Sequence, residues 1–457
     1  MPEIREVSEL REWERVSAHS HIQGLGLRKG KALLAADGMV GQEEAREAAG
    51  IVVKLVKEGK FAGRSILFAG PPGTGKTALA LAIAKELGKG VPFVPFAASE
   101  IYSTEMKKTE FLTQTLRKAI GIRIREMRKV YEGVVRNVNI KTEPHPYNPY
   151  QQIPASAVVT IATDKEEKKL SMDQDFAMQF TQQGIVEGDI IQIDIDGARA
   201  VKLGKAEDYA KKEKLDLSSA KLIPTPKGTV FKNREFVYTL SLHHMDMIQS
   251  RQSRQSGGDI FSLFFGGASE KEIDSEMRKA IDENVKEMVK EGKAEILPGV
   301  VFIDECSLLD IETFAFLNRA MEQDLAPIII FATNRGVTDI RGTSIKAPHG
   351  VPLDLLDRML IINTKPYSAE AIRKIVVERA KAEKAELEKN ALDFLTKLGT
   401  ETSLRHCIQL LAPAKEIAKE AKRKKICEAD IKKASKLFVD TRQSVSYLRE
   451  MEKEMLK

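Results

Sequence analysis

The sequence predicts an α/β protein whose parallel-sheet core is interrupted by a β-rich insertion and followed by a helical domain. Three observations lead to this fold class. A glycine-rich loop at positions 70–77 separates an apolar strand from a helix. A second apolar run, Val300 to Ile303, ends on the paired acids Asp304 and Glu305. Between these two motifs, the chain changes to the period-2 alternation of β-strands.

The first motif has the spacing of a phosphate-binding loop. It follows the apolar strand Ser65 to Ala69 and precedes a helix from Ala78 to Leu87, as such loops do. Glycines let the backbone curl around a polyphosphate, and the helix dipole favours the same anion. We therefore expect ATP or GTP as the ligand, with an ordinary glycine-rich turn as the alternative. The residues expected to bind it are Gly70, Pro71, Pro72, Gly73, Thr74, Gly75, Lys76 and Thr77, with Lys76 on the β and γ phosphates and Thr77 on Mg²⁺.

The second motif is typical of a buried parallel strand with carboxylates at its tip. We expect Asp304 to orient Mg²⁺ and Glu305 to polarise the attacking water. A helix cap with two adjacent acids is the alternative, but it does not explain so apolar a run. The later strand, Pro327 to Ala332, ends in Thr333 and Asn334. The Asn334 amide is expected to hold the water or the γ-phosphate, and a turn-forming asparagine is the alternative.

The distance between the motifs predicts an insertion. Lys76 and Asp304 are more than two hundred positions apart, whereas the intervening elements of such a core need only about 50 residues. Ile191, Ile193 and Ile195 alternate with polar residues, and Asp196-Gly197 is a hairpin-turn signal. Short strands with turns between them predict a small barrel. The other strands expected here are Val130 to Ile140, Val158 to Ile161 and Ala198 to Leu203.

The rest of the sequence predicts the remaining elements of the sheet core and a helical C-terminal part. Residues 249–267 mix Ser, Gln, Arg and Gly with three Phe, and are expected to be mobile or bound to a partner. From Ser368 the chain is expected to be helical to its end, as a lid domain. The further expected elements are a strand from Val91 to Phe96 and helices from Thr109 to Ala119, Lys271 to Lys293, Thr313 to Glu322, Ala369 to Ala382 and Thr402 to Lys422.

Composition limits the class of protein. Lys and Arg total 72 against 66 acids, a formal charge of +6, which does not by itself indicate a nucleic-acid binder. Three widely spaced cysteines argue against a disulfide framework and a cysteine-rich metal site. The sequence contains neither a signal peptide nor a membrane span, so we expect an intracellular protein. Two basic clusters could contact nucleic acid, and the alternative is that each is an ordinary solvent-exposed helix face. They are Arg123, Arg125, Arg128 and Lys129, and Lys422, Arg423, Lys424 and Lys425.

The residues as a series resemble the RuvB-like AAA+ ATPases, the pontin and reptin family, over essentially the whole chain. The matching stretches are 18–26 (AHSHIQGLG), Gly41-Gln42, the loop at 70–77, 102–105 (YSTE), Pro298-Gly299, 332–336 (ATNRG) and 348–358 (PHGVPLDLLDR). The resemblance implies an AAA+ core, an insertion containing an OB domain and a helical lid. The implied boundaries are residues 1–121 and 296–367 for the core, 122–295 for the insertion and 368–457 for the lid.

The resemblance also implies roles for residues outside the two motifs. Arg358 is expected to reach the γ-phosphate of a neighbouring subunit, and an ion pair with Asp354 or Asp357 is the alternative. Arg405 is expected to sense the γ-phosphate within its own subunit. His19 and His21 belong to a segment expected to fold over the nucleotide, where Gly41 and Gln42 are also expected. The chain departs from the family where Cys306-Ser307-Leu308-Leu309 replaces Val-His-Met-Leu.

The expected function is ATP hydrolysis by a hexameric ring, single or stacked in pairs, with ATP or ADP and Mg²⁺ bound. The class implied is a 5′-3′ DNA helicase, acting on single- or double-stranded nucleic acid or remodelling chromatin and other complexes. The alternative is a nucleotide-gated scaffold or chaperone for protein clients. The mixture of pontin-like and reptin-like motifs favours an archaeal member of the family. An archaeal protein is expected in the cytoplasm, and a eukaryotic one in the nucleus and cytoplasm.

Overall fold

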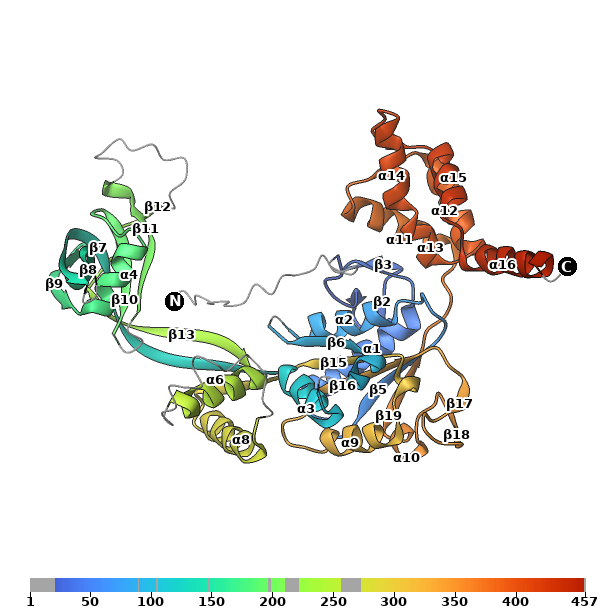
Figure 1. The fold of residues 1–457 in the computed structure, drawn as a ribbon, viewed down its shortest axis with the longest axis horizontal. Coiled ribbons are helices and arrows are strands. Elements are labelled where there is room, and N and C mark those ends of the chain that lie inside the picture. Colours follow the sequence, from blue (N-terminus) through green and yellow to red (C-terminus); the bar gives the residue numbers. More distant parts are fainter. Residues whose placement is uncertain are drawn as a thin grey trace. The chain divides into compact units, whose positions relative to one another are not determined.

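The chain folds as two compact units (Figure 1). The computed structural model describes residues 21–88, 90–103, 106–145, 148–195, 199–209, 222–255 and 273–455. One unit comprises residues 124–238, and the other is built from the chain before and after it. The inserted segment is therefore a separate body, while the two distant motifs belong to the same unit.

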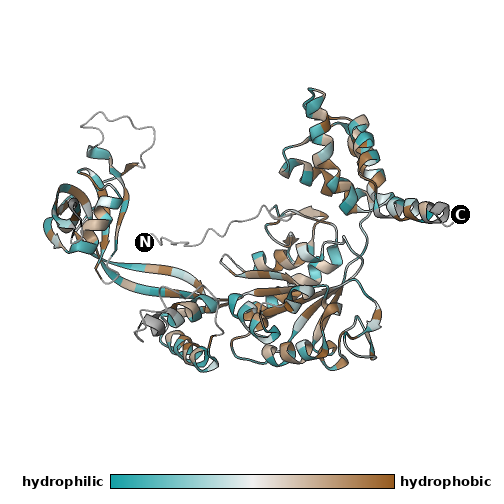
Figure 2. Ribbon diagram, in the orientation of Figure 1, coloured by the Kyte–Doolittle hydropathy of each residue, from teal (hydrophilic) through white to brown (hydrophobic). Residues whose placement is uncertain are grey.

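A five-stranded parallel sheet forms the centre of the larger unit (Figure 1). Each strand ends at the same edge, since Asp304 pairs with Ala97 and Thr333 pairs with Ala69. The strands are continuous apolar runs because helices cover both faces, and Figure 2 shows these strands as the most hydrophobic part of the fold. In spatial order they are β19 (Met359–Asn363), β5 (Ser65–Ala69), β16 (Ile328–Thr333), β15 (Val300–Asp304) and β6 (Phe93–Ala97).

Alternate residues of the strands enter two different cores. Ile66, Phe68 and Phe302 face the first core, and Leu67, Val301 and Ile303 face the second. The first core is closed by α1 (Glu43–Lys57) and α2 (Lys76–Leu87), and the second by α3 (Lys108–Lys118) and α9 (Ile311–Met321). The expected strand 65–69 is observed at those bounds, and the expected helices around 78–87, 109–119 and 313–322 begin one or two residues earlier.

The described chain after residue 368 forms six helices, of which the first five enclose a core of their own. The expected helix from Thr402 to Lys422 is wrong, because two helices meet at Leu410. In a continuous helix, Pro413 would lie in the interior, where proline removes a backbone hydrogen bond and its ring clashes with the preceding turn. In the observed structure, Pro413 lies in the first turn of α14, where the backbone N–H has no partner within the helix. The helices are α11 (Ala369–Ala382), α12 (Lys389–Glu401), α13 (Leu404–Gln409), α14 (Leu411–Glu420), α15 (Glu428–Leu437) and α16 (Thr441–Met455). The parallel pair β20 (Glu386–Leu387) and β21 (Lys425–Ile426) interrupts the expected all-helical run.

The inserted unit is β-rich, and its OB topology remains a prediction. Gln192 and Asp194 are buried together with Ile191 and Ile193, so the alternation does not separate core from solvent here, and only Ile195 is exposed. Residues 196–198, with the expected hairpin turn, lie outside the described part. The elements are β7 (Ile120–His145), β8 (Asn148–Ala162), β9 (Glu167–Met172), α4 (Gln174–Gln182), β10 (Asp189–Asp194), β11 (Arg199–Ala206), β12 (Leu222–Ile223) and β13 (Phe231–Ser241).

Two helices of the larger unit, α6 (Leu242–Gln255) and α8 (Ser275–Lys290), pack against each other. Residues 249–255 of the segment expected to be mobile or bound to a partner are helical, and 256–272 lie outside the described part. Arg117 of α3 joins both helices to the core. Its guanidinium donates twice to Asp246 at 2.5 Å and once to Asp282 at 2.8 Å. Since Asp246 is fully buried, this pair is desolvated and its geometry is tightly determined.

We expect Arg117→Met to lower the stability of the larger unit by ~3–5 kcal/mol, because it leaves the buried Asp246 carboxylate unpaired. Thermal and urea unfolding of the full chain would measure the loss. Lys60→Met is the control, since the exposed pair of Lys60 with Glu58 is worth less than about 1 kcal/mol. Adding Asp246→Leu should recover much of the loss, and an Arg117→Met variant as stable as the control would contradict this interpretation.

Candidate functional site

A cavity of about 480 Å³ opens at the edge of the parallel sheet where its strands end. Five parts of the chain line it. They are the segment from His21 to Val40, the loop at 70–77, the tips of β15 and β16, Tyr367, and the helices α11 and α13. A site at the carboxyl ends of parallel strands is the usual position for ligands in open α/β sheets. The distant motifs thus face the same space.

The loop at 70–77 takes its shape from the chain at 364–367. Gly70 lies directly against Thr364, since a Cβ on Gly70 would be 2.2 Å from Thr364 Oγ1. The Thr364 hydroxyl also bonds that of Thr74 at 2.7 Å. Gly75 has φ +84°, and a Cβ there would be 2.5 Å from the Tyr367 hydroxyl. Both glycines are therefore required by close approach, and Gly75 by its left-handed backbone as well.

Lys76 is the first residue of α2 and lies within the loop. Its ammonium donates to the carbonyls of Gly70 at 2.9 Å and Pro71 at 2.8 Å. Burial lowers the pKa of Lys76, and Arg405 lowers it further, while Asp304 acts in the opposite direction. Lys76, Asp304 and Arg405 therefore share one electrostatic environment, although they come from three distant parts of the sequence.

The acids occupy the tip of β15. Asp304 is the last residue of the strand and accepts a hydrogen bond from the Glu305 amide at 2.9 Å. Glu305 adopts a left-handed backbone conformation, with φ 54° and ψ 43°, and its side chain is exposed. Asn334 follows the next strand, β16, and lines the same cavity. A lysine, two carboxylates and an amide are thus gathered around one space.

The segment before α1 is held by a buried arginine. Arg46 is fully buried and donates to the carbonyls of Leu25, Gly26, Leu33 and Gly41. These bonds fix the segment that carries the cavity-lining residues Ile22, Met39 and Val40. Opposite them, Ile375, Leu404 and Ile408 of the lid helices complete an apolar lining.

His21 lines the cavity beside Glu378 and Arg379, and His19 lies outside the described residues. Burial lowers the pKa of His21 from its ordinary value, and the neighbouring Arg379 lowers it further, while Glu378 acts in the opposite direction; the neutral ring is thereby favoured. Gly41 and Gln42 are not among the described residues that line the cavity. The Gln42 amide instead bonds the backbone N–H and carbonyl of Lys365.

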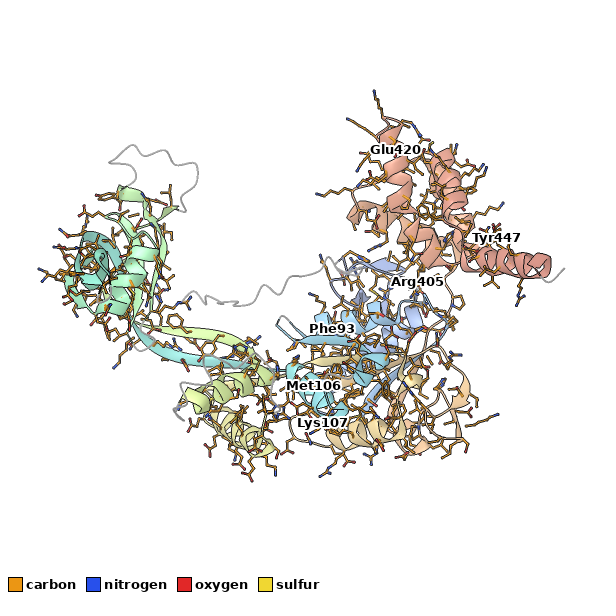
Figure 3. All side chains as sticks on the ribbon, viewed as in Figure 1. Phe93, Met106, Lys107, Arg405, Glu420 and Tyr447 are labelled. Carbon is orange, nitrogen blue, oxygen red and sulfur yellow. The ribbon has the colours of Figure 1, made fainter. Side chains whose placement is uncertain are left out.

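The two arginines expected to contact phosphate lie in different places. Arg405 projects from α13 into the cavity (Figure 3). Arg358 is not among the described residues that line it. Its guanidinium is partly exposed and pairs with Glu322, which is neither of the partners that the sequence suggested. The single chain therefore places most of the described candidates at one cavity. Those that do not line it are Arg358, Gly41, Gln42 and the loop residues Gly70, Pro71 and Thr74.

Tyr367 is a cavity residue that the motifs did not reveal. Its hydroxyl donates to the Thr74 carbonyl at 3.1 Å, and burial raises its pKa to about 12. Its ring also packs at the Gly41 backbone, where a Cβ would be 3.0 Å from Cδ1. The signal in the sequence is weak, since the aromatic residue lies between a strand and a helix and belongs to no motif.

The fold and the site define a P-loop nucleotide-binding protein. The chain matches the TIP49 P-loop domain over residues 15–370 and the TIP49 AAA-lid domain over residues 375–440. It is 41% identical to RuvB-like protein 1 of Arabidopsis thaliana, over 99% of both chains. It is 43% identical to RuvB-like helicase 1 of Drosophila melanogaster, over 98% of both, and 42% identical to RuvB-like helicase 1 of Kluyveromyces lactis, over 99% of both.

This protein belongs to the TIP49 family of RuvB-like AAA+ proteins. The resemblance recognised in its motifs is confirmed, and so are the P-loop core and the helical lid. Within the described residues, no helix combines the length and the apolar composition needed to cross a membrane.

We expect Tyr367→Phe to weaken nucleotide binding about fivefold, because it removes the hydrogen bond that steadies the loop at Thr74. Titration with a fluorescent ATP analogue would measure the change. Tyr447→Phe is a matched control, since Tyr447 is exposed on α16 (Figure 3). Equal affinities for the two variants would show that the hydroxyl does not support the loop.

Proposed function

We propose that this protein hydrolyses ATP in the cavity between the loop at 70–77 and the lid helices. The observation that carries the proposal is that Lys76, Asp304, Glu305, Asn334 and Arg405 line one space. The cavity volume of about 480 Å³ is within the usual range for small-molecule sites. The apolar lining suits the nucleotide's ring system, while the cations and loop amides suit its triphosphate.

The residues also suit a magnesium ion. Thr77 and Asp304 supply a hydroxyl and a carboxylate, which are the hard oxygen ligands that Mg²⁺ prefers. When bound, the ion would neutralise charge on the phosphates. Lys76 would leave the carbonyls of Gly70 and Pro71 for a phosphate oxygen, which is a stronger, charge-assisted partner.

Hydrolysis follows from the positions of the remaining groups. Glu305 is the proposed base, because its carboxylate is exposed at the cavity and can accept a proton from water. Asn334 would orient that water, and Arg405 would bind the γ-phosphate from the lid. The His21 ring lies beside the lid residues Glu378 and Arg379, where it would help to keep bound nucleotide from leaving.

We propose that a neighbouring copy completes the site. Arg358 is partly exposed and its exposed ion pair with Glu322 is weak, so the guanidinium can exchange partners at little cost. An arginine supplied by another subunit stabilises transition-state charge and makes hydrolysis depend on assembly. A closed ring, hexameric as in the RuvB-like type, provides this contact at every site.

Glu305→Gln should bind ATP normally and lose turnover by ~10²–10⁴-fold, since the amide cannot take the proton. Phosphate release and equilibrium nucleotide binding would be measured on the same preparation. Lys76→Ala should lose binding itself, and Lys60→Ala, an exposed lysine, should change neither. Normal turnover by Glu305→Gln would refute the assignment of the base.

Arg358→Ala should retain nucleotide and lose turnover by about 10³-fold. A mixture of Arg358→Ala with Glu305→Gln should regain activity, because some sites then combine an intact Glu305 with an intact Arg358 from the neighbour. Arg373→Ala, at another exposed arginine, is the control. A mixture no more active than its components would exclude action between subunits.

The inserted unit has a surface that suits single-stranded nucleic acid. Tyr131 and Phe231 lie with ring centroids 5.4 Å apart, and the Lys168 ammonium is 4.8 Å from the Tyr131 ring. Phe231 is 38% exposed. Aromatic faces beside cations bind stacked bases of any sequence. We therefore propose that DNA stimulates ATP hydrolysis and that the protein separates DNA strands; its relatives are named helicases. The alternative function is a scaffold for protein clients.

Phe231→Ala combined with Lys168→Glu should weaken single-stranded DNA binding at least fivefold, since stacking on one base is worth ~1–3 kcal/mol. Fluorescence anisotropy at two salt concentrations and unwinding of a tailed duplex would measure it. Phe438→Ala in the lid is the matched control. Unchanged DNA binding, with ATP turnover stimulated only by protein, would favour the scaffold.

A further inference from the structure

Glu305 has a backbone conformation that needs support from its surroundings. Its φ of 54° lies in the left-handed region, which side chains other than glycine rarely adopt. Such a residue persists where neighbouring structure determines it, and it is typical of functional sites. Glu305 begins the turn η2 (Cys306–Leu308), which leads to Asp310, the cap of α9. The direction of the carboxylate therefore depends on what holds this turn.

The Tyr102 hydroxyl holds the turn at two points. It donates to the Leu308 carbonyl at 3.0 Å and accepts from the Asp310 amide at 2.9 Å. Tyr102 ends η1 (Ala98–Tyr102), which follows β6, the strand paired with β15. The two bonds thus fasten the turn after Glu305 to the neighbouring strand of the sheet. Tyr102 is not among the described residues that line the cavity, so it supports the turn from outside.

Two cations fix the Tyr102 ring and bind the same turn. The Arg341 guanidinium lies 3.8 Å from the ring centroid and donates to the Leu308 carbonyl at 3.2 Å. The Lys108 ammonium lies 5.1 Å from the ring and 2.6 Å from an Asp310 carboxylate oxygen. Tyr102 therefore acts at the centre of a cluster in which each cation contacts both the ring and one end of the turn.

The buried Cys306 also anchors the turn, and the Tyr102 hydroxyl keeps its proton. Cys306 is fully buried, and burial raises its pKa to about 12, so it packs as a small apolar group. Burial also raises the pKa of Tyr102, and the Asp310 charge adds to this rise, which outweighs the opposite effects of Arg341, Lys108 and the Asp310 backbone bond. The neutral hydroxyl can then serve as donor and acceptor together, as the two bonds require.

We propose that Tyr102 is a positioning residue for hydrolysis: its hydroxyl, held between Arg341 and Lys108, fixes the turn that directs the Glu305 carboxylate into the cavity. The inference rests on the proposed role of Glu305 as the base. Tyr102 would act on the chemical step alone, because it touches the turn after the base and lies apart from the loop that binds phosphate.

The test is Tyr102→Phe, which removes both hydrogen bonds and keeps the ring between the cations. We expect kcat for ATP to fall roughly tenfold, from the loss of two hydrogen bonds at the turn, with nucleotide affinity changed less than about twofold. Tyr447→Phe is again the matched control. A second variant, Arg341→Met, removes the stacked cation and its bond to Leu308, and should lower kcat in the same way.

A double-mutant cycle separates positioning from a general structural effect. In the Glu305→Gln background, adding Tyr102→Phe should leave the slow single-turnover hydrolysis unchanged, because there is no base left to position. Additive losses would overturn the proposal, as would a Tyr102→Phe variant with unchanged kcat or one whose defect is in nucleotide affinity. If Glu305→Gln itself kept full turnover, the proposed base would fail instead, so the two failures are distinguishable.

Discussion

The parallel pairing of β5, β16 and β15 is the constraint on which the site depends. Each strand ends at the same edge, so the loop after Ala69, the amide after Thr333 and the acids at Asp304 emerge side by side. No contact between the loops themselves is needed to bring them together. Buried backbone pairing and the two apolar cores determine the arrangement, and the polar residues need only occupy the strand tips.

This constraint explains how the chain accommodates a separate folded unit between its two motifs. The insertion leaves the larger unit after α3 and returns through α6 and α8, so the pairings among the five strands of the sheet stay intact. Its return is fixed by Arg117, which binds Asp246 on α6 and Asp282 on α8. Because loop length adds little to the entropy of closure, a large insertion at this point costs the core little stability.

Features that are local in sequence could be predicted, and features that depend on tertiary contact could not. The strand at 65–69, the loop at 70–77 and the acids at 304–305 are each readable within a few residues. The residues that support the site from outside cannot be recognised in this way. Tyr102 reaches Leu308, which is more than two hundred residues away, and Thr364 reaches Thr74 across a similar distance. Thr364 belongs to no motif, and Tyr102 lies in the matching stretch 102–105, which by itself assigns no role to the tyrosine hydroxyl.

The same distinction explains most of the errors made from the sequence. The break at Leu410 is the exception, because Pro413 is a local signal against a continuous helix there. The partner of Arg358 was expected among nearby acids, but Glu322 comes from the end of α9. The alternation in 191–194 indicated a strand, which is observed as β10, but its polar residues Gln192 and Asp194 are buried as well, Asp194 in an ion pair with Arg128. In these last two examples, the partner comes from a part of the chain distant in sequence.

The helix α3 is tied at both of its ends, and the two ties differ in strength. At its C-terminal end, Arg117 pairs with the fully buried Asp246, and breaking that pair would leave a charge without water. At its N-terminal end, Lys108 pairs with Asp310 while remaining 42% exposed, so water can replace either partner at small cost. The same end of α3 carries Glu110, whose side chain is 10% exposed and pairs with Arg278 of α8, so the end as a whole is firmly attached. The exposed Lys108–Asp310 pair is therefore the most easily altered contact between α3 and the turn that follows Glu305.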